Sequence, residues 1–150
     1  MKLSTKGRYG ARAMLDLALH SNINEPVTLN SIAERQDISE QYLEQIFSVL
    51  RKSGLVESVR GAQGGYRLGR DASKITVGDI VRVLEGSLDP VDCISCDNTT
   101  KCDRYDLCVM KDVWQKVSDS INSAVDSFTL YDLMEKHHEK NKDNEPMFYI

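Results

Sequence analysis

Apolar residues recur at helical spacing from the start of the chain, and small polar residues divide the pattern into separate helices. The first helix is predicted to begin at a cap on Ser4 or Thr5 and to end near residue 20, with Met14 and Leu17 on its inner face. A second, shorter helix is predicted to follow a cap at Thr28 and to end near residue 36.

The third predicted helix has two different faces. It is capped by Asp37 or Ser39, runs to about residue 53, and has apolar residues at positions 43, 46, 47 and 50, which is the spacing of a buried stripe. A short helix, a tight turn and a second helix with a polar face make up the helix-turn-helix plan, in which the second helix enters the major groove by its N-terminal half. On that polar face Gln45 can pair with an adenine edge, and Glu44 can accept from a cytosine amino group.

A glycine-rich hairpin is predicted directly after these helices. A short strand around Leu55 to Val59 is followed by the turn at 60–65, which holds three glycines, and by a return strand at 66–68. Arg60 and Arg67 stand at the base of the hairpin, so it can lie along phosphates or enter the minor groove as a wing. A nucleotide-binding glycine loop would need a helix N-terminus directly after it, whereas a strand follows here.

The second half of the chain is dominated by one long amphipathic helix. Thr76, with Asp79 as its capping-box partner, starts a fourth short helix before it. After Cys108, valine or isoleucine recurs every four residues for about five turns, and so wide an apolar band must be buried. It can pack on its own head, but pairing with a second copy is favoured, because two linked heads gain affinity and register on DNA. Thr129 caps a last short helix.

The predicted fold is therefore mainly α-helical with a small β-hairpin. We expect a winged helix-turn-helix head over residues 1–89, a cysteine-rich loop over 90–108, a dimerisation helix region over 109–134, and a flexible C-terminal tail over 135–150. The expected partners are double-stranded DNA with a pseudo-palindromic operator and a second copy of the chain, giving a homodimer.

The charge distribution agrees with a DNA-binding head. The net charge is -4, but residues 1–89 hold 12 basic and 11 acidic side chains, so the acidity belongs to the second part of the chain. Residues 51–70 contain five basic side chains and one acidic side chain, Glu57. This local excess of positive charge suits contact with a phosphate backbone.

All four cysteines of the chain lie between residues 93 and 108. No apolar run is long enough to cross a bilayer, so we expect a cytoplasmic protein without a membrane partner, in a compartment where thiols stay reduced. Clustered cysteines there favour a metal site or redox chemistry over disulfides. An iron–sulfur cluster, a thiol switch and a structural zinc site all remain open, although the two five-residue gaps fit a zinc ribbon poorly. No catalytic arrangement is apparent, so we do not expect an enzyme.

Four ordered motifs show a resemblance to a known family. They are 6–10 (KGRYG), 38–45 (ISxxYLEQ), 50–56 (LRKxGLV) and 59–66 (VRGxxGGY), and with them the chain resembles the Rrf-type winged-helix repressors, above all their iron–sulfur cluster regulators. The resemblance continues through Trp114 and implies a homodimer. It also implies base contacts from the third helix and a wing arginine at Arg60. The predicted DNA-binding residues are Ser39, Gln41, Tyr42, Glu44, Gln45, Arg51, Arg60, Gly64 and Gly65.

The resemblance also implies a cluster-binding loop. The cluster regulators have three cysteines with five residues between successive ones and then a histidine, and Cys96, Cys102 and Cys108 match the cysteines. The histidine position holds Lys111, which cannot bind iron while protonated. Cys93 is then the candidate fourth ligand, or the partner subunit supplies one. The expected cofactor is an iron–sulfur cluster, 2Fe–2S rather than 4Fe–4S, although four thiolates can hold either.

The last four residues, 147–150, resemble the C-terminus of the cysteine-metabolism repressors in the same family. Those repressors are thought to work with cysteine synthase, and a free terminal isoleucine on a flexible arm resembles the tail by which serine acetyltransferase enters that enzyme. Ile150 is therefore a candidate partner-binding residue for cysteine synthase, by carboxylate capture. The alternative is that the tip folds back on the protein's own surface.

Overall fold

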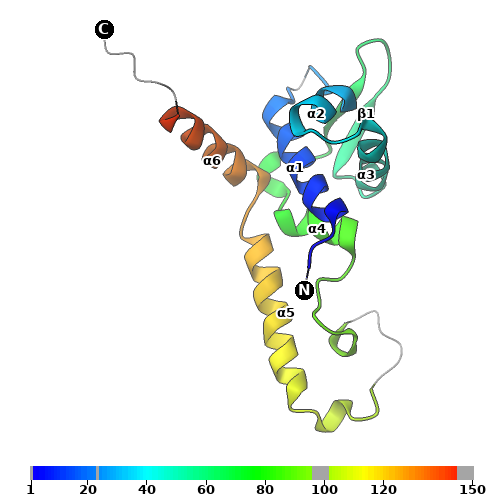
Figure 1. Ribbon diagram of the computed structural model, residues 1–150, viewed down its shortest axis with the longest axis vertical. Helices are drawn as coiled ribbons and strands as arrows, with labels where there is room; N and C mark the ends of the chain where they lie inside the picture. The colour runs from blue at the N-terminus through cyan, green and yellow to red at the C-terminus, as the bar shows by residue number, and fades with distance from the viewer. Residues whose placement is uncertain (1, 23, 96–101, 145–150) are drawn as a thin grey trace.

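A computed structural model describes residues 2–22, 24–95 and 102–144, and it has the predicted winged-helix architecture (Figure 1). Two antiparallel strands pair in register from Val56 with Leu68 to Val59 with Gly65. None of the described helices is long and apolar enough to cross a membrane. The elements are α1 (Thr5–His20), α2 (Leu29–Gln36), α3 (Glu40–Lys52), β1 (Val56–Val59), β2 (Gly65–Leu68), η1 (Ala72–Lys74), α4 (Val77–Glu85), η2 (Asp92–Ile94), η3 (Tyr105–Leu107), α5 (Met110–Asp126) and α6 (Leu130–Asp143).

The helices begin where polar caps predict them to begin. The Ser4 hydroxyl accepts a hydrogen bond from the backbone N–H of Gly7 at 3.1 Å, and the Ser39 hydroxyl accepts one from Tyr42 at 3.2 Å. Of the two candidate caps that the sequence offered for each helix, Ser4 therefore caps α1 and Ser39 caps α3. Asp37, the other candidate cap for α3, instead ends α2 with a φ of 53° and closes the helix-turn-helix turn.

The core of the head lies where α1, α3 and α4 meet the base of the hairpin. Phe47 of α3 packs edge-on against Tyr66 of β2, with ring centroids 5.0 Å apart. Val27 exchanges backbone hydrogen bonds of 2.7 and 2.8 Å with Tyr66, so the segment before α2 pairs with β2 at one antiparallel bridge. The side chains with no exposed area include Met14, Leu17, Ile32, Leu43, Ile46, Phe47, Leu50, Ile75, Ile80 and Leu130.

Helix α5 leaves the head and extends well beyond it (Figure 1). Polar contacts tie its C-terminal half to α4: Arg82 donates to Asn122 at 2.9 Å and to Asp126 at 2.5 Å. Only Ser118 of its side chains is buried, and it donates to Asp89. Val113 and Val117 remain 47% and 37% exposed, so the part of the chain that the structure describes leaves much of the predicted apolar band uncovered.

Helix α6 begins on the head and continues into the segment predicted to be a tail. Leu130 is fully buried, and its backbone N–H donates to Ile75 at 2.9 Å, so the start of α6 is docked on the head. A capping box between Thr129 and Asp132 starts the helix, which then runs to Asp143. The dimerisation region over 109–134 and the flexible tail over 135–150 stay predictions.

Candidate nucleic-acid interface and cysteine segment

The predicted base-reading residues share the face of α3 that points away from the core. Gln41, Glu44 and Gln45 are exposed, while Leu43 and Ile46 between them are fully buried. Tyr42 is half-buried, because its ring packs edge-on against Tyr9 of α1 at 6.1 Å. The Ser39 hydroxyl is engaged as the helix cap, so its first role is to fix the start of α3. The arrangement leaves free side-chain donors and acceptors on the first two turns of the helix.

A buried ion pair fixes α2 against α1 and was missed in the sequence. Asp16 is 2% exposed and accepts hydrogen bonds from Arg35 at 2.6 and 3.1 Å and from the Gln36 amide at 2.8 Å. The hydrogen bond to Asp16 raises the pKa of Arg35. An acid on the apolar face of the first helix, between Ala13 and Leu17, was the available signal, since a buried carboxylate needs a partner.

The two wing arginines have different surroundings. Arg67 pairs with Glu57 on the neighbouring strand at 3.0 Å, so much of its charge is already compensated. Arg60 is exposed at the turn and forms no ion pair with any described carboxylate. Arg51, in the last turn of α3, is also exposed and unpaired within the same described parts of the chain. Arg60 and Arg51 are therefore exposed cations that this side of the head can offer to a phosphate backbone.

The wing glycines are required by the hairpin itself. A Cβ at Gly65 would lie 2.5 Å from the carbonyl oxygen of Val27, and one at Gly64 would collide with the carbonyl of Val59. Gly61 has a φ of 117°, which side chains rarely adopt. These residues let the backbone turn tightly and keep the tip slim; their predicted contact with DNA stays a prediction.

The cysteine segment links α4 to α5. Cys93 lies half-buried in η2, Cys102 is exposed, and Cys108 is half-buried just before α5; these three thiols are free, and Cys96 lies outside the described residues. Thiol side chains are the donor type that an iron–sulfur cluster takes, so the chemistry of the set fits. Within the described ranges no three candidate ligands already converge. The ammonium group of Lys111 lies 4.3 Å from the centroid of the Tyr105 ring and does not point to a ligand role.

Asp89 joins the head, the cysteine segment and α5. Its carboxylate accepts hydrogen bonds from the hydroxyls of Ser118, Ser87 and Ser95, and these bonds lower the pKa of Asp89. Ser118 belongs to α5, whereas Ser95 lies between two of the cysteines. A change in the cysteine segment can therefore reach α5 through one side chain.

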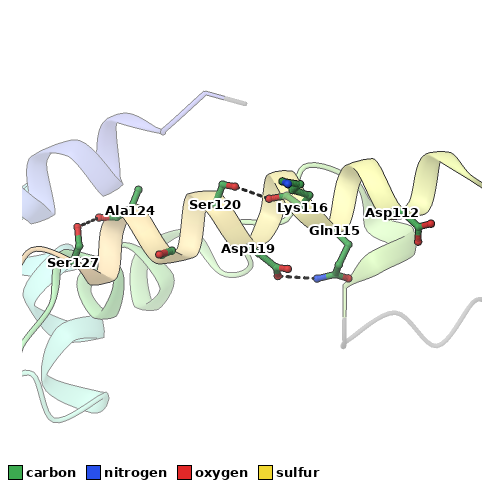
Figure 2. Close-up of a pocket in the computed structure, with 8 residues that line it drawn as sticks. Asp112, Gln115, Lys116, Asp119, Ser120, Ala124 and Ser127 are labelled. Carbon is green, nitrogen blue, oxygen red and sulfur yellow. Dashed lines mark hydrogen bonds between the residues drawn. The ribbon is translucent and has the colours of Figure 1, made fainter.

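A shallow hollow along α5 does not form an enclosed site. Figure 2 shows its lining residues on one face of the helix, where Gln115 bonds Asp119 at 3.0 Å and Ser120 and Ser127 bond backbone carbonyls of their own helix. Because one helix lines it, the hollow is an open surface rather than a ligand cavity.

A helix-turn-helix with an adjoining wing and a long helix that extends from the head define a winged-helix transcriptional regulator. The chain belongs to the Rrf2 family: the sequence model of that family, described as an iron-dependent transcriptional regulator, matches residues 3–136.

The relatives agree with this assignment. The chain is 48% identical over 145 residues to the HTH-type transcriptional regulator IscR of Vibrio atlanticus strain LGP32, covering 97% of this chain and 78% of the relative. Among solved structures it is similar to T. potens IscR, with 51% identity, a TM-score of 0.74, and coverage of 93% and 90% of the two chains. It is also similar to CymR, the global cysteine regulator of B. subtilis, with 43% identity, a TM-score of 0.73, and coverage of 91% and 98%.

Proposed function

We propose that the protein is a homodimeric DNA-binding regulator, mostly a repressor, that senses iron–sulfur cluster status and controls genes of cluster biogenesis or of cysteine and sulfur metabolism. The observation that carries the DNA-reading part is the exposed face of α3 beside the unpaired Arg60 and Arg51. The base contacts fall to Gln41, Tyr42, Glu44 and Gln45 in the first turns of α3, and the phosphate contacts to the two arginines and the backbone of the wing.

Dimerisation is supported by the exposed side of α5. Val109, Met110, Val113 and Val117 are 79%, 44%, 47% and 37% exposed, and all four lie toward the start of the helix, away from the contacts with α4. Large apolar side chains in a row are seldom left in water. A second copy covers them symmetrically, since the same surface on each chain meets its equivalent. The pair then places two heads on successive half-sites of one duplex.

The cluster is proposed to be held by Cys96, Cys102 and Cys108, with Cys93 as the fourth ligand and two irons rather than four. When bound, such a cluster would link the thiolates to one another through iron. These links would respond to redox state and oxygen. The candidate ligands do not converge in the described parts of the chain, so binding is expected to bring Cys93, Cys102 and Cys108 closer together. Lys111 stays on Tyr105 and contributes positive charge beside the thiolates.

Asp89 is the proposed link between the cysteine segment and the DNA-reading heads. If cluster binding moves Ser95 together with the cysteines, the Asp89 carboxylate loses one of its three hydroxyl donors. Because Ser118 of α5 shares that carboxylate, the angle at which α5 leaves the head is biased by the state of the segment. Coupling of about 1–3 kcal/mol is typical of such linked sites.

The DNA-reading part is tested with duplexes selected by the protein from a random-sequence pool. Arg60→Ala should weaken binding uniformly across sequences and reduce the salt dependence of the association constant, as a lost phosphate contact does. Glu44→Ala should instead change which bases are tolerated in the half-site. Binding that is unchanged in both variants would place the recognition surface elsewhere.

The cluster part is tested on protein purified without oxygen. The expected result is a brown protein containing iron and acid-labile sulfide, whose colour is lost in Cys96→Ser, Cys102→Ser and Cys108→Ser. Cys93→Ser shows whether that thiol is the fourth ligand. A colourless protein with zinc indicates a structural metal site, and a metal-free protein whose thiols form disulfides under mild oxidant indicates a thiol switch.

A second candidate function is a repressor of cysteine metabolism that works with cysteine synthase and has no cluster. The 43% identity to the global cysteine regulator CymR favours it. The proposed contact is Ile150 in the active site of the synthase, and this residue lies outside the described part of the chain. A chain ending at Glu145 should lose binding to purified cysteine synthase, and equal binding by both forms refutes the contact.

A further inference from the structure

Two unpaired arginines lie along the exposed side of α1, outside the surface already described. Arg8 and Arg12 are both exposed, and in the described ranges neither forms an ion pair with a carboxylate. The guanidinium of Arg8 donates one hydrogen bond within the described ranges, to the Thr5 hydroxyl at 3.3 Å. By contrast, Arg35, Arg67 and Arg82 each meet an acid within 3.0 Å. Thr5, Arg8 and Arg12 follow each other at spacings of three and four, so they form one stripe along the helix.

This stripe adjoins the recognition helix. The Arg12 guanidinium lies 5.5 Å from the centre of the Tyr9 ring, and Tyr9 packs edge-on against Tyr42 in the first turns of α3. Arg12 also donates to the carbonyl of Gln36 at 2.7 Å, the last residue of α2. Arg12 is thus fixed at the helix-turn-helix turn, with Arg8 one turn further along the same stripe.

The stripe and the wing flank α3 on different sides. Tyr42 faces α1, whereas Phe47 faces Tyr66 of the wing. Phe47 comes five positions after Tyr42, so at about 100° per residue their side chains leave α3 about 140° apart. A helix in the major groove has a phosphate backbone on each side, so the two flanks of α3 meet different strands.

We propose that the α1 stripe is a second phosphate-binding surface, with Arg8 contacting the backbone strand opposite the one that the wing meets. Within the stripe, Arg12 is held in place by its contacts with Gln36 and Tyr9 and adds a second positive charge next to Arg8. The two surfaces together clamp α3 between the phosphate rims of the groove. This inference rests on the proposed DNA-binding function and adds contacts on a helix outside the helix-turn-helix and the wing.

The salt dependence of binding to a duplex selected by the wild-type protein tests the proposal. Arg8→Gln should lower the slope of log K against log salt by about 0.9 for each head on the duplex. At 0.1 M salt the same contact corresponds to a loss of about eightfold in affinity per head. Lys142→Gln, in the last turn of α6, removes the same charge far from α3 and should leave the slope unchanged. Among the described residues the Arg8 side chain makes one hydrogen bond, to the exposed Thr5 hydroxyl, so far-UV circular dichroism and the unfolding midpoint of Arg8→Gln should match the wild type.

Interference by ethylated phosphates locates the contact. With wild-type protein, ethylation should block binding on both strands that border the major-groove site, and Arg8→Gln should lose sensitivity on one strand only. Arg60→Ala should lose sensitivity to ethylation on the other strand. The two variants would then assign the wing and the α1 stripe to different strands. If Arg60→Ala lowers the slope but Arg8→Gln does not, the second surface is refuted and the DNA-binding function stands. If no duplex is selected by the wild type, the proposed function itself falls.

Discussion

The buried pair between Asp16 and Arg35 holds the first helix of the helix-turn-helix in place, and Arg35→Met tests that role. Asp16 is 2% exposed, and Arg35 supplies three of the hydrogen bonds that its carboxylate accepts. Removing the arginine leaves a buried carboxylate whose main partners are the Gln36 amide at 2.8 Å and His20 at 3.6 Å. Breaking a buried pair in this way usually costs about 3–5 kcal/mol.

We expect a loss near the lower end of that range, about 3 kcal/mol, because the Gln36 amide still donates and Arg35 is itself 35% exposed. For a chain of this size the unfolding midpoint should fall by about 6–12 °C. The assay is far-UV circular dichroism during urea unfolding, for the free energy, and during thermal unfolding, for the midpoint. Both use one fixed protein concentration, since the stability of any dimer depends on concentration. Glu34→Met, at the neighbouring exposed position of α2, is the matched control and should change stability by no more than about 0.5 kcal/mol.

A double-mutant cycle separates the pair from the loss of one side chain. Asp16→Leu with Arg35→Met removes both charges and should recover most of the stability lost in Arg35→Met alone. If Arg35→Met costs less than about 1 kcal/mol, or if the double variant is no more stable than the single one, the Asp16–Arg35 pair does not hold α2 in place.

Three further predictions concern the joints of the molecule. Leu130→Ala should destabilise the head by about 3 kcal/mol in urea unfolding, because the side chain is fully buried; a loss below about 1 kcal/mol would show that α6 is not docked. The hydroxyl bonds that lower the pKa of Asp89 stabilise the fold above the unfolded pKa of about 3.9, and this stability is lost as pH falls through the lower folded pKa. Unfolding measured from pH 5 to pH 2.5 should therefore fall more steeply in wild type than in Asp89→Asn, and parallel curves would exclude the contribution. Val117→Lys should convert the dimer to monomer in sedimentation velocity, whereas Ser123→Lys on the polar face of α5 should not; a dimer in both variants would place the interface elsewhere.

Local chemistry explains why the head could be predicted from its sequence. The caps at Ser4, Thr28 and Ser39 and the capping box at Thr76 depend on neighbouring residues, and the helices begin there. The buried stripe of α3 follows from its spacing in the same way, so the fold class and the position of the wing were confirmed.

Contacts between distant residues are what the sequence did not reveal. Arg67 was expected to meet phosphate, but its cross-strand partner Glu57 depends on the hairpin register. The docking of Leu130 onto Ile75, and so the length of α6, depends on a contact between residues 55 positions apart. The unpaired state of Arg8 is also a property of the assembled head, because it depends on where every acid lies.

The most direct test of DNA reading by α3 is selection of bound duplexes from a random-sequence pool by the wild-type protein, with Glu44→Ala in parallel. The account predicts that the wild type enriches a pseudo-palindrome with half-sites about one helical turn apart. It also predicts that Glu44→Ala relaxes the preference at one position in each half-site while still binding. If the wild type enriches no sequence, or if both proteins enrich the same one equally well, α3 is not the element that reads DNA.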